Sequence, residues 1–346
     1  MAHRNRVSKS DRWLPGRHSG VSFSMAGLLI LIAWCGCLAA LGDELPTRGT
    51  VIRFGDVREG VAALTRQDEY IKQMGPFDRQ VRLQTDREVS EHELLAFMGA
   101  NVLAWSDDDV QQLTPVLEAM GKKLEPWTLN LPREVLLVKT TGREEGHAAY
   151  CRGAAIVIPE ALISKGTKVL EMVLPHEIFH IASSHNPALR EALYQIVGFK
   201  ACNEVELPKA LRVRKLTNPD APVNDHYIMV TLNGRSVELM PLLFSAVEYY
   251  DPNRGGTLSS YMEFKLMVLE NSDGVRRPAL VNGQPMLLRP NSVPGFMEQV
   301  GRNTSYLIHP EEILADNFVL VINERMNLPS QRIVEEMGKV LHGTWR

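Results

Sequence analysis

Residues 167–184 read TKVLEMVLPHEIFHIASS, and the five residues from His176 to His180 are the ones that suit metal chemistry. The two histidines are four positions apart, so both imidazoles project from the same face of a helix. Neutral imidazole is a good zinc ligand, and Glu177 at the flank of that face can act as a base on a water molecule at the metal. The pattern predicts a hydrolytic zinc site on a helix from about Thr167 to Ser184.

The residues around the motif favour a buried helix. Ile178, Phe179, Ile181 and Ala182 are uncharged, as packing against a core requires. Pro175 kinks this helix if it begins early, or occupies its first turn if it begins late. The alternative interpretation is a buried helix whose histidines only satisfy local hydrogen bonds.

A catalytic zinc site needs a third protein ligand and one open position. A histidine six residues after His180 is one known solution, but Asn186 stands there and His185 is off by one. The sequence therefore excludes that arrangement and points to a more distant ligand.

Residues 309–317, HPEEILADN, supply the best distant candidates. Glu312 and Asp316 are four residues apart, which is about one turn of a helix opening at Pro310. Glu312 can bind the metal, and Asp316 can accept a hydrogen bond from a ligating histidine. Glu311 is an alternative ligand and His309 a weaker one.

With these two helices the chain resembles the gluzincins, the thermolysin-like zinc metallopeptidases. The resemblance implies Zn²⁺ bound by His176, His180 and Glu312, with Glu177 as general base and Asp316 supporting His176. It also implies a peptide or protein substrate and a zincin-like catalytic core with a long insertion between the two ligand helices. Residues 148–158 could be the edge strand along which an extended substrate binds.

The predicted fold class is α+β. Residues 43–130 are expected to be mostly helical, with helix starts at Ser90 and Ser106 and a bend or break at Pro115. Residues 131–346 are expected to form the zincin-like catalytic region. Whether residues 43–130 act as a pro-segment stays open.

Strands are predicted within the catalytic region where apolar and β-branched residues gather. An antiparallel β-rich insertion is expected at about 225–290, opening with a two-residue hairpin at Asn233-Gly234. The predicted elements of this region are strands at 135–140, 148–158, 227–232, 236–247, 258–269 and 279–288, and helices at 188–197, 310–323 and 330–342.

Residues 1–42 are predicted to be a signal peptide. A basic leader precedes an apolar run from Met25 to Leu41, and Ala40 and Gly42 provide the small side chains of a cleavage site. The protein is therefore expected to be extracytoplasmic, periplasmic or secreted, with membrane contact only through this segment. An uncleaved N-terminal anchor is the alternative.

The composition of the chain bears on which molecules it is expected to bind. The chain has 346 residues, 45% hydrophobic and 23% charged, with a formal net charge of -3. Without a broad basic field, nucleic acid is not an expected partner. Cys151 and Cys202 either pair in an oxidising compartment or remain separate thiols.

Two functional questions stay open at the level of sequence. The donor for an oxyanion could be Tyr150, His226, Tyr227 or Tyr306. The main alternatives to a peptidase are a non-catalytic exported zinc-binding protein and a zinc hydrolase acting on a non-peptide amide, such as a cell-wall component.

Overall fold

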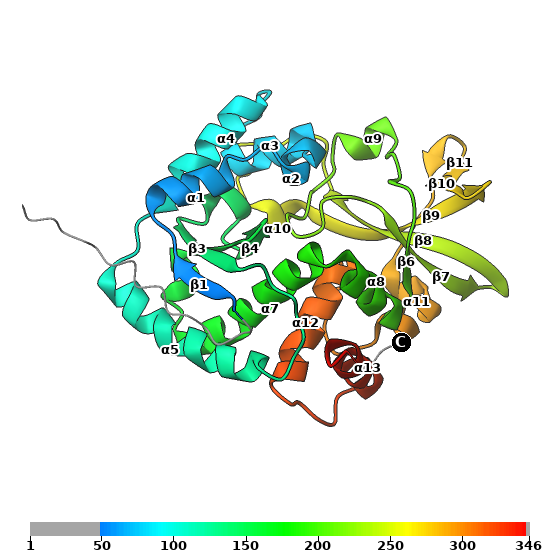
Figure 1. Ribbon diagram of the computed structural model, residues 1–346. Coiled ribbons are helices and arrows are strands. Elements are labelled where there is room, and N and C mark those ends of the chain that lie inside the picture. The colour runs from blue at the N-terminus through cyan, green and yellow to red at the C-terminus, as the bar shows by residue number, and fades with distance from the viewer. Residues whose placement is uncertain (1–48, 344–346) are drawn as a thin grey trace, which may run out of the picture. The chain divides into compact units, whose positions relative to one another are not determined.

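The computed structural model describes residues 49–343, and their fold is α+β (Figure 1). The predicted signal peptide lies outside the described residues. Within residues 49–343, no helix is both long and apolar enough to cross a membrane.

The first sheet is formed by strands from the N-terminal half of the described chain. Its strands are β1 (Val51–Phe54), β2 (Val102–Leu103), β3 (Glu134–Thr140), β4 (Tyr150–Arg152) and β5 (Ala155–Pro159). The order is β1-β3-β5-β4, with β2 beside β3. Strands β1, β3 and β5 are parallel, and β4 runs antiparallel to β5 at the edge.

The single strand predicted over residues 148–158 is wrong. The chain reverses at Gly153, which has a φ of +62°, and the segment forms a tight hairpin of β4 and β5. Glycine adopts this left-handed conformation without the steric cost of a Cβ atom. The result is a short edge strand, β4, placed directly over the helix of the HEIFH motif.

Helices cover both faces of this sheet. On one face lie α1 (Val57–Leu64), α2 (Glu69–Gln73), α3 (Pro76–Leu83) and α4 (Glu91–Ala100), which pack around residues such as Tyr150 and Val157. On the other face lie α5 (Asp107–Leu124) and α7 (Thr167–His185), against Ile156 and Ile158. Two short helical segments, η1 (Arg143–Glu145) and α6 (Glu160–Ile163), lie in the connections.

The predicted starts of α4 and α5 are confirmed. Ser90 accepts a hydrogen bond from the backbone of Glu93, and Ser106 accepts one from Asp109, as N-caps do. Pro115 does not break α5, which runs on to Leu124.

Helices α7 and α12 (Pro310–Ile322) lie side by side in the interior (Figure 1). Their contact includes the rings of Phe179 and Phe318, whose centroids are 5.7 Å apart. Because α7 begins at Thr167, Pro175 lies inside the helix and not in its first turn. Helices α8 (Pro187–Ile196) and α13 (Gln331–Leu341) pack beside them.

The second sheet occupies most of the predicted β-rich insertion and is antiparallel. Its strands are β6 (Phe199–Ala201), β7 (His226–Leu232), β8 (Arg235–Ser245), β9 (Met262–Ser272), β10 (Val275–Pro278) and β13 (Leu287–Leu288). The predicted hairpin is confirmed, since β7 and β8 pair up to Leu232 and Arg235 and both turn residues have positive φ.

Two predicted strands of this region are wrong in part. One helical turn, α10 (Leu258–Tyr261), precedes β9, and the stretch 279–288 breaks into β11 (Leu280–Val281), β12 (Gln284–Pro285) and β13. The remaining short elements are α9 (Lys209–Arg212), η2 (Pro290–Ser292) and α11 (Pro294–Val300). Cys151 and Cys202 are free thiols, which removes the disulfide alternative for this structure.

Candidate metal centre

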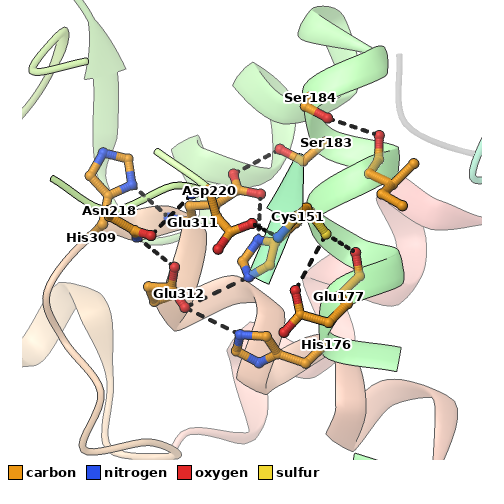
Figure 2. A network of polar contacts seen from close by, with 12 residues as sticks. Cys151, His176, Glu177, Ser183, Ser184, Asn218, Asp220, His309, Glu311 and Glu312 are labelled. Atoms are coloured by element: carbon orange, nitrogen blue, oxygen red, sulfur yellow. Dashed lines mark hydrogen bonds and ion pairs between the residues drawn. The ribbon is translucent and has the colours of Figure 1, made fainter. Parts of the chain in front are cut away.

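The structure brings together the three side chains that the sequence selects as metal ligands. Nε2 of His176 lies 3.2 Å from Oε2 of Glu312, and Nε2 of His180 lies 3.7 Å from the same oxygen. The histidines come from successive turns of α7, and Glu312 comes from the first turn of α12. Figure 2 shows His176 and Glu312 turned toward each other. Pairing of these two helices therefore creates the cluster.

The spacing of these atoms suits a tetrahedral zinc ion. Ligand atoms held about 2.1 Å from such an ion are separated from one another by about 3.4 Å. The three ligand atoms all lie within 4.8 Å of one another. Two imidazoles and one carboxylate also leave a fourth position for water or substrate, which is the ligand set of several catalytic zinc sites.

Carboxylates on α12 fix the orientation of both rings. Nδ1 of His176 lies 3.0 Å from Oδ1 of Asp316, and Nδ1 of His180 lies 3.0 Å from Oε1 of Glu311. Because a carboxylate only accepts, each Nδ1 carries the proton and each Nε2 is turned toward Glu312. Hydrogen bonds of this kind set the tautomer of a metal-binding histidine and increase its basicity.

Glu311, which sequence reasoning offered as an alternative ligand, instead supports His180. Its second oxygen accepts hydrogen bonds from the hydroxyls of Ser183, at 2.8 Å, and Tyr194. All three of these contacts are buried. His309 caps α12, since its Nδ1 accepts a hydrogen bond from the backbone N–H of Glu311.

Glu177 lies beside the cluster and is 3% exposed. Its Oε2 is 3.3 Å from Sγ of Cys151 on the edge strand β4. Burial raises the pKa of Glu177, although the nearby rings of His180 and His176 oppose the shift. This carboxyl group is therefore in a setting where it can take up and release a proton.

The segment before β7 closes another side of the site, and no sequence motif marked it. The amide of Asn218 donates to Oε1 of Glu312 over 2.6 Å, leaving Oε2 free to face the histidines. Asp220 accepts a hydrogen bond over 2.9 Å from the backbone N–H of Cys151, which points outward from β4. These two side chains tie the segment to α12 and to the edge strand (Figure 2).

Electrostatics at the cluster favour positive charge. Burial would lower the pKa of His180, but Asp220, Glu312 and the bond to Glu311 raise it to about 10. Burial would raise the pKa of Glu312, but the His180 ring and the bond to His176 lower it to about 2. The carboxylates gathered here would stabilise a bound cation in the same way.

A cavity of about 350 Å³ opens onto the cluster and is lined by His176, Glu177, Asp220 and Glu312. Of the four proposed oxyanion donors, Tyr306 lines this cavity. The other three do not line it: Tyr150 is fully buried, His226 is held by Asp225 and Glu191, and Tyr227 lies under the guanidinium of Arg276.

Replacing Asp316 with alanine is expected to weaken zinc binding by about 10- to 100-fold. The change removes the acceptor that orients His176, while all three ligand side chains remain. Competition with a chromophoric chelator measures the affinity. Glu335→Ala, an exposed carboxylate on α13, is the control, and equal zinc affinity in both variants would contradict this role of Asp316.

No known family model, curated protein or solved structure matches the chain.

Proposed function

We propose that this chain is an exported zinc-dependent metallopeptidase of gluzincin type, in which His176, His180 and Glu312 hold the metal. The observation that carries the proposal is the approach of both Nε2 atoms to Oε2 of Glu312, at 3.2 and 3.7 Å. Residues from two helices far apart in the sequence converge there with a spacing compatible with tetrahedral zinc.

The chemistry follows from the side chains around that point. When bound, zinc supplies Lewis acidity, which polarises a carbonyl group and acidifies water. Glu177 takes a proton from the attacking water and delivers it to the leaving amine. Tyr306, which lines the cavity, is the best placed of the predicted donors to stabilise the developing oxyanion through its hydroxyl.

A peptide substrate is favoured by the surroundings of the cluster. The edge strand β4 lies beside Glu177, and an extended chain could add to this edge of the sheet if it replaced Asp220 as the partner of the outward N–H of Cys151. A second cavity of about 360 Å³, lined by Met172, Val173 and Asp316, shares His176 and Glu177 with the first. A substrate would therefore find space on both sides of the reacting bond.

The test combines metal analysis with a search for peptide cleavage. With one equivalent of zinc, the wild-type chain is expected to bind one ion and to cleave members of a mixed peptide library. Activity should disappear with a chelator and return with zinc. His180→Ala should lose both zinc and cleavage, because two ligands do not make a tight site.

His185→Ala is the matched control, because this exposed histidine lies on the same helix outside the cluster. It should keep both properties. Zinc binding with no cleavage of any peptide would overturn the peptidase proposal. It would favour a zinc-binding protein or, if amide-containing cell-wall fragments are cleaved, a hydrolase of another substrate class.

A further inference from the structure

A second group of potential metal ligands lies beside the first. Sγ of Cys151, a carboxylate oxygen of Glu177 and one of Asp220 all lie within 4.8 Å of one another. They come from β4, α7 and the segment before β7, and Figure 2 shows the three side chains close together. Cys151 and Glu177 are 7% and 3% exposed, so this is not a chance gathering of surface acids.

The geometry of this group is compatible with a small divalent ion. The distance between Sγ of Cys151 and Oε2 of Glu177 is 3.3 Å. Two ligands of a tetrahedral zinc ion, with bonds of about 2.3 Å to sulfur and 2.1 Å to oxygen, lie roughly 3.5 Å apart. Asp220 is already held against β4 by the N–H of Cys151, so little reorganisation is needed to complete the set.

The chemistry of the donors selects the ion. A thiolate with two carboxylates favours zinc and related thiophilic cations over magnesium or calcium, which prefer oxygen ligands alone. On binding, the Cys151 thiol gives its proton to solvent as the metal–sulfur bond forms, and the two carboxylates contribute two further negative charges. A water molecule can fill the fourth position from the cavity that Asp220 and Glu177 line.

We propose that Cys151, Glu177 and Asp220 form a second, inhibitory binding site for zinc or another thiophilic divalent cation. An ion in this site takes the carboxylate of Glu177 as a ligand and so removes it from its role as base. The binding site itself stands independently of the catalytic proposal, whereas inhibition rests on the function proposed above. Excess zinc would then limit the activity of an enzyme that needs one zinc ion to work.

Cobalt(II) distinguishes the two sites, because only the second contains sulfur. A thiolate bound to cobalt gives an intense charge-transfer absorption in the near ultraviolet, which a site of two histidines and a glutamate does not give. In the full-length wild-type chain, this band is expected to grow with the second equivalent of cobalt. The band should be absent from Cys151→Ser. In Asp220→Asn, the cobalt concentration that gives half of the full band should rise at least about tenfold.

Cys202→Ser is the matched control and should retain the whole band, because Cys202 is outside the group. Cys35 and Cys37 are present in both serine variants, so any cobalt–thiolate absorption from them cancels when the two variants are compared. The visible cobalt spectrum at the first equivalent should be the same in Cys151→Ser as in wild type, which shows that this variant is folded. A missing band in wild type, or an equal band in Cys151→Ser, would overturn the proposal.

Inhibition of peptide cleavage by zinc is measured separately from the binding of cobalt. Excess zinc should slow peptide cleavage by the wild-type chain, and the zinc concentration for half inhibition should rise at least about tenfold in Cys151→Ser. If the chain cleaves no peptide, the proposed function fails, and the cobalt band still decides whether the second site exists. If cleavage occurs and both chains are inhibited alike, the inhibitory role is refuted.

Discussion

Glu177→Gln is expected to lower kcat for peptide cleavage by about 10²- to 10⁴-fold, the range that a general base contributes. Glutamine has nearly the same shape and can still contact Cys151, but it cannot accept a proton from water. Because Glu177 is not one of the three proposed ligands, zinc bound at the first equivalent should be unchanged. Steady-state kinetics and metal analysis on the same preparation measure both quantities.

Glu171→Gln provides the comparison for this experiment. Glu171 is an exposed carboxylate on the same helix, away from the cluster, and its replacement should leave kcat within about twofold of wild type. The base assignment would be refuted if Glu177→Gln kept comparable activity with its zinc in place.

Arg82→Ala is expected to destabilise the fold by about 3–5 kcal/mol, the cost of breaking a buried ion pair. The Arg82 side chain is 1% exposed, and its guanidinium lies 2.7 Å from both Asp78 and Glu145. Alanine would leave these two buried carboxylates without a compensating charge. Urea unfolding curves of the variant and the wild type give the change in the free energy of unfolding. The comparison assumes that this free energy falls with urea concentration at the same slope in both proteins.

Arg53→Ala is the control for burial. Arg53 also bridges two carboxylates, Glu59 and Glu134, but these are 38% and 53% exposed. Its loss should cost less than about 1 kcal/mol, because water solvates the partners that remain. Equal destabilisation by the two changes would show that the Arg82 network does not behave as a buried ion pair.

The parts of the fold that could be predicted from sequence are those with local causes. Proline at position 310 and the serines at 90 and 106 mark helix starts through backbone groups within one turn, and Asn233-Gly234 sets a hairpin through its own dihedral angles. Strand β1 was not predicted, because it is short and its partner in the sheet, the parallel strand β3, lies far along the chain. The reversal at Gly153 was missed because apolar residues continue on both sides of it.

The residues of the candidate site also fall into those with a local sequence pattern, which could be predicted, and those without one, which could not. The spacing of His176 and His180 and that of Glu312 and Asp316 are helical, so sequence alone could assign them to common faces. Whether Glu311 or Glu312 meets the Nε2 atoms of the histidines depends on how α12 is rotated against α7, and that rotation is set by packing. Asn218 and Asp220 come from an irregular segment with no periodicity to reveal them.

The parallel pairing of β1 with β3 has a consequence for how far the chain could be shortened from its N-terminal side. Val51–Phe54 forms one edge of the sheet whose opposite edge is β4, and Arg82 from the same N-terminal region anchors Glu145 at the wall of the cavity. Residues 51–130 thus contribute to the sheet and to the cavity wall, and their removal is expected to disrupt both. We expect that any proteolytic trimming that preserves the candidate metal centre stops before Val51.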